Sequence, residues 1–532
     1  MKPIKTIASL ILVLITIFTS LNLTSAYVHA VQLPQYVRIG LTQRHNEQAR
    51  ITVGSPSIEI GYSIGYSFIP AASLSAQASF AVVPTNGHFV RLSQTFGSFS
   101  AARDYAAIPN SVPVLIDRGM WAVYIVGLDE HSARNHADGS FISASTSRIA
   151  LMDGDRVVLI SENTSAMMHL RSTNGQTALG DRQYRGILEI GRFAGRNVTA
   201  VNIVNMEEYL FSVVPSEMPA SWHIEALKAQ ATAARTYTVR RQHAHSAQGF
   251  SLCDTEHCQV YHGIGREHYR STQAVNATRG RLILFNGEPI EAVYFSSSGG
   301  ITANSEDVWV NPRPYLRAVA DIHEITGRVW SRTFTLSQLT YLMNRQNVSI
   351  GQVQAVQTIT RSGRVQELIF VGSSGSHRIT HENIRWFFSP IGSLYSRNFF
   401  IEGTAQAQQA FTPGHPGPAA QLFVTNGFAV NESIPSVLRS VNAANALNSL
   451  PITASVVSAS STTQLNLTAS PSAPLITADT TTATSTGYTI TLHGRGWGHG
   501  VGMSQHGAHN MAQAGYTFEQ ILRWYYTGVE IR

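Results

Sequence analysis

The chain has 532 residues, of which 43% are hydrophobic and only 13% are charged. This length allows two or three domains that each bury a sizeable core. The 41 glycines, 20 prolines and many Ser and Thr residues are typical of β-rich, loop-rich extracellular proteins rather than helical cytosolic enzymes. The net charge is +6, but no Lys/Arg cluster is interleaved with aromatic residues, so we expect no nucleic-acid partner.

The N-terminus has the pattern of a secretory signal. Two lysines precede an apolar run over residues 7–23, and small residues permit cleavage after Ala26 or after Ala30. We therefore expect residues 1–30 to be a signal peptide. The alternative is a retained membrane anchor, because the run approaches the length that spans a bilayer. In both cases the protein is exported to the cell wall or the extracellular face of the membrane, and it contacts the membrane only if the segment is retained. A mildly basic exported chain is suited to a polyanionic wall.

Residues 31–183 consist of short alternating stretches broken by Gly, Ser and Asn, which predict a β-rich accessory domain. Two segments, 94–102 and 124–133, have a strand and turn leading into a short helical stretch. They resemble wall-binding SPOR repeats; ordinary strand-to-helix connectivity is the other interpretation.

Residues 184–403 are expected to form the central domain. Apolar stretches predict strands over 187–190 and 198–204. A short helix is expected to open at Met206. Pro219 occupies a position where a second helix is expected to begin, because a missing N–H costs nothing in the first turn.

Residues 225–243, rich in Ala, Leu, Gln, Lys and Arg, predict a long helix. Glu225 and Lys228 are expected to pair on its surface. One face carries mostly small side chains that let another element pack closely, namely Leu227, Ala231, Ala234 and Thr238.

Residues 404–486 contain too few large apolar side chains to offset the entropy cost of ordering, so they predict a flexible low-complexity insertion. Residues 487–532 then complete the central domain, with a strand over 488–492, a glycine-rich turn, and helices over 503–514 and 518–526. The whole pattern predicts an α+β fold with a β-rich core and a few packed helices.

A lone carboxylate, Glu217, lies in the segment Val-Val-Pro-Ser-Glu-Met-Pro and is followed by the Ala-rich helix. Further motifs follow along the chain: Gln-Val-Tyr-His-Gly (259–263), Ala-Thr-Arg-Gly (277–280), Val-Tyr-Phe-Ser-Ser-Ser-Gly-Gly (293–300) and Gly-Trp-Gly-His-Gly-Val-Gly-Met-Ser-Gln (496–505). Together these segments resemble the SpoIID/LytB family of sporulation and cell-wall proteins over 184–403 and 487–532.

The resemblance implies a peptidoglycan lytic transglycosylase that cuts MurNAc–GlcNAc linkages in strands stripped of stem peptides. The motif glutamate of the family maps onto Glu217, which is then the catalytic residue. Other members are described as stimulating a cell-wall amidase. The alternative function is therefore a non-catalytic wall-binding protein that stimulates an N-acetylmuramoyl-L-alanine amidase.

A single glutamate suits this chemistry. Hydrolytic glycosidases generally need two carboxyl groups. A lytic transglycosylase uses the C6 hydroxyl of the sugar as nucleophile, so one carboxyl group can protonate the leaving oxygen and then accept the hydroxyl proton. Desolvation by Met218 and Trp222 favours the protonated form of Glu217, and a helix N-terminus at Pro219 favours the ionised form. The sequence does not decide between them.

The glycine-rich turn 494–502 is a second candidate for the sugar cleft, because glycines let the backbone approach a ligand closely. Loop 296–300 is similar, and tight packing between strands is the alternative for both. Motif position and chemistry give six candidates for holding sugars: Trp222, Gln230, Arg235, Ser297, His499 and Gln505.

The two cysteines lie five residues apart among histidines. Two thiols and two imidazoles make a tetrahedral zinc site, and some relatives carry a structural zinc in this loop. The expected ligands are Cys253, His257, Cys258 and His245, with His243 or His262 as other choices for the fourth. The competing interpretation is a disulfide, which export permits. No organic cofactor is expected.

Overall fold

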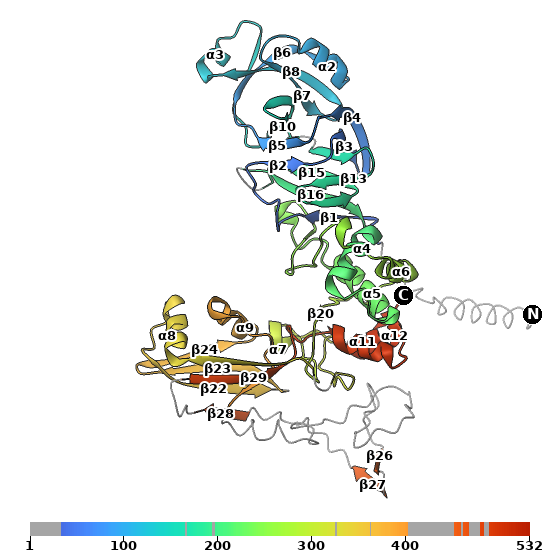
Figure 1. Cartoon of the computed structure of the whole chain (residues 1–532), viewed down its shortest axis with the longest axis vertical. Helices are drawn as coiled ribbons and strands as arrows, with labels where there is room; N and C mark the ends of the chain where they lie inside the picture. The colour runs from blue at the N-terminus through green and yellow to red at the C-terminus, as the bar shows by residue number, and fades with distance from the viewer. Residues whose placement is uncertain are drawn as a thin grey trace, which may run out of the picture. The chain divides into compact units, whose positions relative to one another are not determined.

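The structure, a computed structural model, describes residues 33–164, 167–193, 197–324, 327–361, 363–402 and 489–532, and the backbone of three strands within 452–483. Two compact units are present: residues up to Ala292 together with Gly528–Arg532, and Val293–Thr527. The predicted α+β, β-rich fold is confirmed (Figure 1). The predicted signal peptide lies outside the described residues. Within the described part of the chain, no helix combines the length and apolarity needed to cross a membrane.

The first unit contains a seven-stranded sheet. Its strands in spatial order are β17 (Leu252–Cys253), β1 (Tyr36–Gly40), β16 (Thr199–Asn205), β15 (Ile187–Gly191), β12 (Met168–Ser172), β3 (Ser57–Ile64) and β4 (Ser67–Ser75). The central strands β15 and β16 are buried almost throughout, and most of their residues are apolar. β1 pairs with β16, and β12 pairs with β15. The domain boundary expected between residues 183 and 184 therefore falls between strands that belong to one sheet.

A ten-stranded sheet is the second large sheet of this unit. Its spatial order is β14 (Arg182–Arg185), β13 (Gln176–Leu179), β2 (Ile51–Val53), β5 (Phe80–Pro84), β10 (Ile149–Asp153), β11 (Arg156–Ser161), β7 (Ser111–Asp117), β8 (Met120–Leu128), β6 (His88–Phe96) and β9 (Gly139–Ile142). The two predicted strand-to-helix segments are present: β6 leads into α2 (Phe99–Tyr105) and β8 into α3 (Glu130–Arg134). Ser98 and Asp129 cap these helices with their side chains.

The other helices of the first unit follow β16 in the chain, and the three longest of them pack on one another near β1 (Figure 1). They are α4 (Met206–Glu217), α5 (Ile224–Arg240), α6 (Tyr269–Ala277) and the short 3-10 helices η1 (Ser246–Gln248) and η2 (Ile264–Arg266). A small sheet of β19 (Glu288–Pro289), β18 (Ile283–Phe285) and β31 (Glu530–Ile531) brings the C-terminus into this unit. α5 confirms the long predicted helix, with its small-residue face fully buried, and Glu225 pairs with Lys228 at 2.7 Å.

The prediction that Pro219 begins a helix is wrong. Pro219 follows the end of α4, and α5 begins only at Ile224, capped by His223. Met218, just before this proline, has extended backbone angles of φ −136 and ψ 132. A residue before proline is pushed out of the helical region, so Pro219 ends α4 instead of starting a helix.

A buried ion pair joins α4 to α5. The Arg235 guanidinium is fully buried and donates to both carboxylate oxygens of Glu207, at 2.9 and 2.6 Å. It also donates to the carbonyls of Arg281 and Val275, both at 3.3 Å. With these partners Arg235 lies in the core of the helical layer rather than at a surface.

The second unit is built on two larger sheets. One has β21 (Val329–Thr335), β29 (Thr489–Arg495) and β25 (Phe399–Ile401); the other has β24 (Gly375–Thr380), β23 (Arg364–Gly372), β22 (Val353–Arg361) and β28 (Asp479–Ala483). Helices α8 (Leu336–Arg345) and α9 (Asn383–Phe387) lie on one side of the second sheet, followed by η3 (Ser389–Ile391) (Figure 1). Their apolar side chains share a core with both sheets.

The remaining elements of this unit include the motif segments. β20 (Tyr294–Phe295) pairs in parallel with β30 (Met503–Ser504), and α7 (Glu306–Trp309) follows. The predicted last helices are α11 (Gln505–Gln513) and α12 (Phe518–Tyr525). Most of the predicted insertion lies outside the described residues. Within it, β26 (Ile452–Ser458) and β27 (Ser461–Leu467) form a hairpin, and β28 pairs with β22.

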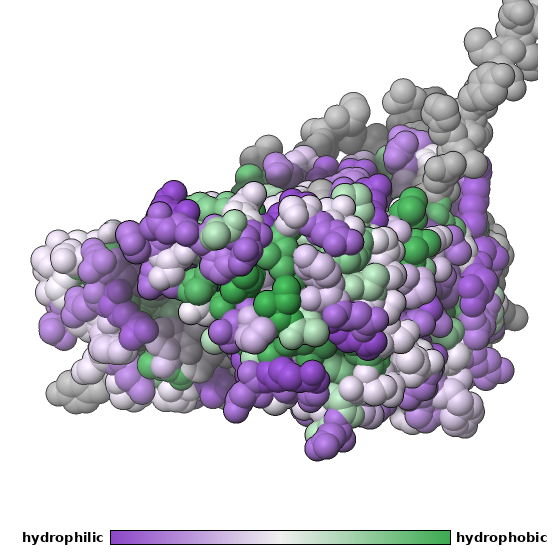
Figure 2. Space-filling model, turned by 90° about the horizontal axis from the view of Figure 1, so that it is seen from above, coloured by the Kyte–Doolittle hydropathy of each residue, from purple (hydrophilic) through white to green (hydrophobic). Residues whose placement is uncertain are grey.

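Several large hydrophobic side chains remain exposed. Figure 2 shows one face of the molecule, on which hydrophilic side chains surround patches of hydrophobic ones. Trp386 is 59% exposed and Trp497 is 39% exposed. A single exposed hydrophobic residue needs no explanation, but an exposed tryptophan with aromatic and cationic neighbours is a candidate ligand contact.

The Arg235–Glu207 pair should stabilise the first unit strongly. Arg235→Ala leaves the Glu207 carboxylate buried without its partner, so we expect a loss of about 3–5 kcal/mol in the free energy of unfolding. The matched control Lys228→Ala breaks a pair on the surface of the same helix and should cost about 0.5 kcal/mol. Urea unfolding followed by circular dichroism measures both. Equal losses would contradict the structural role of Arg235.

Candidate functional site

Glu217 is the last residue of α4 and is half-buried. Its Oε1 accepts a hydrogen bond from the backbone N–H of Val260 at 2.9 Å. Because a helix presents unpaired carbonyls at its C-terminus, the influence expected from a helix N-terminus does not apply to this carboxylate. The fold therefore places Glu217 at the junction of a helix end and the segment 259–262.

The segment 259–262 is held to the helices by buried side chains. The Oε1 of Gln259 accepts hydrogen bonds from Tyr209 of α4 at 3.1 Å and from Thr238 of α5 at 2.8 Å. The Tyr261 hydroxyl donates to Asn202 of β16 at 2.8 Å. Since Val260 lies between these two anchors, its N–H is fixed where it meets Glu217. The sequence motif contained these residues, but nothing in the sequence indicated their positioning roles.

Arg270 of α6 fixes the turn that follows Glu217. Its guanidinium donates to the carbonyl of Ala220 at 2.9 Å and to the carbonyl of Trp222 at 2.8 Å. Trp222 is half-buried in this turn. Trp222 and Glu217 therefore lie at the two ends of one short segment that Arg270 holds in place.

Gln230 and Arg235, the other sugar-binding candidates of the first unit, are fully buried within α5. Arg235 is engaged with Glu207. The amide atoms of Gln230 have no hydrogen-bond partner among the described residues. Neither side chain presents a surface to a glycan strand in this structure.

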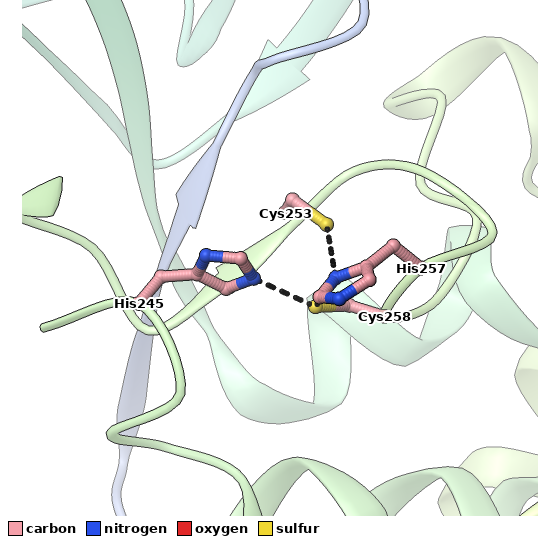
Figure 3. A group of neighbouring side chains, drawn as sticks. All are labelled: His245, Cys253, His257 and Cys258. Atoms are coloured by element: carbon pink, nitrogen blue, oxygen red, sulfur yellow. Dashed lines mark hydrogen bonds between the residues drawn. The ribbon is translucent and has the colours of Figure 1, made fainter. Parts of the chain in front are cut away.

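Four residues gather in the cysteine loop (Figure 3). The ligand atoms of His245, Cys253, His257 and Cys258 all lie within 4.8 Å of one another. The His245 Nε2 lies 3.2 Å from the Cys258 Sγ, and the His257 Nδ1 lies 3.5 Å from that sulfur and 3.6 Å from the Cys253 Sγ. Both cysteines are free thiols. The structure thus brings together the four predicted metal ligands.

The donor set fits zinc. Two sulfurs and two imidazole nitrogens from four residues suit a closed tetrahedral site. The other nitrogen of His245 is hydrogen-bonded to Gln248, which orients the ring as outer partners of metal-binding histidines do. The hydrogen bond between the two thiols lowers the pKa of Cys253 and raises that of Cys258, so the two sulfurs share one proton in the metal-free site.

The glycines of the turn 494–502 bring it close to the protein itself. A Cβ on Gly502 would lie 2.1 Å from the carbonyl oxygen of Val293, and a Cβ on Gly500 would lie 2.6 Å from Cζ of the buried Arg364. Both glycines have positive φ, of 77° and 91°. These glycines therefore serve tight packing against β20 and Arg364, the alternative to backbone approach by a ligand.

His499 lies inside this packed turn. Its Nε2–H donates to the Tyr294 carbonyl at 3.1 Å, and its Nδ1 accepts from the Val501 N–H at 3.1 Å. Phe295 and Trp309 pack against the ring. Burial lowers the pKa of His499 to about 3, so the imidazole is neutral and both of its nitrogens are used by the backbone.

A buried carboxylate, Glu324, is hydrogen-bonded to two motif segments of the second unit. It accepts hydrogen bonds from the hydroxyls of Ser297, Ser298 and Ser504, and from the backbone N–H of Ser298 at 2.8 Å. Ser504 also caps α11, whose first residue, Gln505, is buried. Ser297, a predicted sugar ligand, is therefore engaged with Glu324. Sequence reasoning missed Glu324, which lies in no motif.

Asp321 accompanies Glu324 in the same core. The Tyr525 hydroxyl donates to its Oδ2 at 3.0 Å. Burial, together with the nearby charge of Glu324, raises the pKa of Asp321 to about 7. The second unit therefore contains a buried acid pair that ties loop 296–300, α11 and α12 together.

The comparisons with known proteins identify the family. A family model described as Stage II sporulation protein, SpoIID, matches residues 194–285, which contain Glu217 and the cysteine loop. The chain is 31% identical over 349 residues to Stage II sporulation protein D of Bacillus subtilis (strain 168), across 62% of this chain and 76% of that relative. The chain therefore belongs to the SpoIID family, as its motifs predicted.

Two further relatives extend the comparison. The amidase enhancer of the same Bacillus subtilis strain is 31% identical over 329 residues, across 60% of this chain but only 40% of the enhancer. Stage II sporulation protein D of Bacillus amyloliquefaciens is 29% identical over 349 residues, across 62% of this chain and 75% of that relative.

The lowered pKa of His499 should make stability depend on pH. The unfolded state takes up the proton near its ordinary pKa of 6.5, and the folded state only near 3. Because the unfolded state binds more protons in this window, the free energy of unfolding should fall as the pH drops from about 6.5 toward 3. His499→Asn removes this group, so its urea-unfolding profile between about pH 7 and 4 should be flatter than that of the wild type. Parallel profiles would contradict the lowered pKa of the His499 imidazole.

Proposed function

We propose that this protein acts on peptidoglycan in the cell wall and cuts its glycan strands as a lytic transglycosylase. Glu217 is the acid and then the base, and the favoured substrate is a strand stripped of stem peptides. The observation that carries the proposal is the half-buried Glu217 carboxylate at the end of α4, fixed by the Val260 N–H. Fixed geometry is what a group that transfers a proton to a glycosidic oxygen requires.

Three other glutamates of the first unit are held in ion pairs, which suits a mechanism with one carboxyl group. Glu207 is paired with Arg235, Glu225 with Lys228, and Glu267 with Arg185. A hydrolase would need a second carboxyl group to act as nucleophile or base. A lytic transglycosylase does not, because the C6 hydroxyl of the sugar attacks and Glu217 receives its proton.

Membership of the SpoIID family supports the cell wall as the place of action. Relatives carry the names Stage II sporulation protein D and amidase enhancer. The signal-like N-terminus and the basic charge suit an exported protein that meets a polyanionic wall. We therefore place this protein outside the cytoplasm, at the wall or at the extracellular face of the membrane.

A structural zinc ion is part of the proposal. His245, Cys253, His257 and Cys258 would hold it, and with four protein ligands the ion has no open position for a reacting water. When bound, zinc supplies a cross-link between the segment after α5 and strand β17. Cys258 directly precedes the Gln259–Val260 segment, so this cross-link stabilises the part of the chain that holds Glu217.

A second function is favoured by one relative. The amidase enhancer matches 60% of this chain, and its name indicates that it acts on an amidase. A wall-binding protein that stimulates an N-acetylmuramoyl-L-alanine amidase would need the folded surface of this chain but not the carboxylate of Glu217. The two functions therefore differ in their response to loss of the Glu217 carboxylate.

Mass spectrometry of the products tests the transglycosylase. Protein from residue 31 onward, incubated with amidase-stripped glycan strands, should release fragments with anhydro ends. Glu217→Gln keeps the size of the side chain and an acceptor for Val260 but cannot transfer the proton, so the rate should fall about 10²–10⁴-fold.

Glu225→Gln is the matched control, because it removes a carboxylate of the neighbouring helix that is paired with Lys228. This variant should cut at the wild-type rate. Products with reducing ends would instead indicate hydrolysis. If folded wild-type protein releases no fragments, yet it and Glu217→Gln stimulate an amidase equally, the second function replaces the first.

Metal analysis tests the zinc site. Purified protein should contain about one zinc ion per chain, and Cys258→Ser should lose most of it and unfold at a lower temperature. Ser251→Ala, a nearby residue that is not a ligand, should retain the metal. A Cys253–Cys258 disulfide in the purified protein, found by thiol titration, would contradict the site.

A further inference from the structure

An exposed aromatic pair lies in the second unit at the glycine-rich turn. The rings of Trp497 and Tyr395 are stacked, with centroids 4.2 Å apart and an interplanar angle of 27°. Trp497 remains 39% exposed, and Tyr395 is half-buried against Trp330. The exposed part of Trp497 offers apolar surface to a ligand, and the stacked Tyr395 fixes its position.

Two guanidinium groups flank this pair. Arg328 lies 5.1 Å from the centroid of the Trp497 ring, and Arg332 lies 4.9 Å from that of Tyr395. Arg332 also donates to the Tyr395 hydroxyl at 2.8 Å. Within the described part of the chain, neither arginine forms an ion pair with a carboxylate. The two guanidinium groups therefore supply positive charge beside the stacked rings.

Backbone hydrogen bonds fix the members of the pair to one another. Trp497 and Ser297 exchange two N–H···O bonds, at 2.8 and 3.0 Å. The Gly498 N–H donates to the Tyr395 carbonyl at 2.8 Å, and the Gly496 N–H donates to the Arg328 carbonyl at 2.7 Å. Ser297 is in turn bound to the buried Glu324. The surface is formed before any ligand arrives, which lowers the entropy cost of binding.

The chemistry of the four side chains selects a class of ligand. The C–H face of a pyranose ring packs on an exposed aromatic ring, and a guanidinium group binds a carboxylate through two parallel hydrogen bonds. A phosphodiester would satisfy the arginines but leave the aromatic surface unused. A neutral sugar would use the aromatic surface but leave the arginines without an anion.

We propose that Trp497, Tyr395, Arg328 and Arg332 form a binding subsite for a pyranose that carries a carboxylate. In peptidoglycan this sugar is N-acetylmuramic acid with a free lactyl group, a choice of ligand that rests on the proposed function. The sugar lies at the exposed part of Trp497, where the Arg328 guanidinium over the indole ring binds its carboxylate.

Binding is measured by NMR on Glu217→Gln protein, which keeps the result independent of cleavage. The probes are N-acetylmuramic acid, N-acetylglucosamine and glycerol phosphate, and the signal is the Trp497 indole N–H, assigned by its loss in Trp497→Phe. N-acetylmuramic acid should shift this signal and bind at least about tenfold more tightly than N-acetylglucosamine, because only the acid offers an anion to Arg328.

The variants separate the two contacts. Arg328→Gln should abolish the preference for the acid while N-acetylglucosamine binds as before. Trp497→Phe lacks the indole signal, so its binding is followed on the backbone N–H signals of Gly496 and Gly498, and it should weaken both sugars. Arg328 is exposed, so its substitution leaves the fold intact. Trp386→Ala is the matched control, since Trp386 is also an exposed tryptophan beside an arginine, Arg385, and its loss should change nothing.

Three results would overturn the proposal. The first is equal affinity for the two sugars in the unsubstituted subsite. The second is a preference for N-acetylmuramic acid that survives Arg328→Gln. The third is glycerol phosphate binding more tightly than either sugar. A failed cleavage assay with normal sugar binding would instead count against the catalytic role of Glu217 and leave the subsite in place.

Discussion

The buried side chain of Gln259 accepts hydrogen bonds from α4 and α5 at the same time, through Tyr209 and Thr238. The position of Val260, and through it that of Glu217, depends on this connection. A buried amide that lost these partners would pay the full cost of desolvation, so the segment has one favourable position between the helices. The turn after Glu217 is held from the other side by Arg270. Rigid support on both sides is what a proton-transferring carboxylate needs.

In the second unit a buried carboxylate likewise fixes the positions of separate segments. Glu324 accepts hydrogen bonds from serines of loop 296–300 and of the segment that begins α11. The glycines of the intervening turn let its backbone pack on β20, and His499 satisfies backbone groups there. These polar residues are therefore structural, and the exposed side chains beside them, Trp497 and Arg328, are the ones available to a ligand.

The two candidate functions share this framework. A transglycosylase needs the proton of Glu217, whereas an amidase-stimulating protein needs only a stable surface that recognises the wall. Zinc in the cysteine loop would serve both, because it stabilises the segment before Gln259 without taking part in a reaction. A subsite for an acidic sugar would also serve both, since each function requires binding to peptidoglycan.

The sequence by itself determined the family, the α+β class, the helix α5 and the Glu225–Lys228 pair. The helix and the ion pair depend on local patterns, such as small-residue spacing and i,i+3 charges, that act within one element. The sequence also predicted one set of metal ligands, His245, Cys253, His257 and Cys258, since they lie within a short stretch. Only the tertiary structure decided that Arg235 is a core residue and that Ser297 and Ser504 bind Glu324. Ser504 and Glu324 are 180 residues apart, and burial and pairing over such separations arise only when the chain has folded.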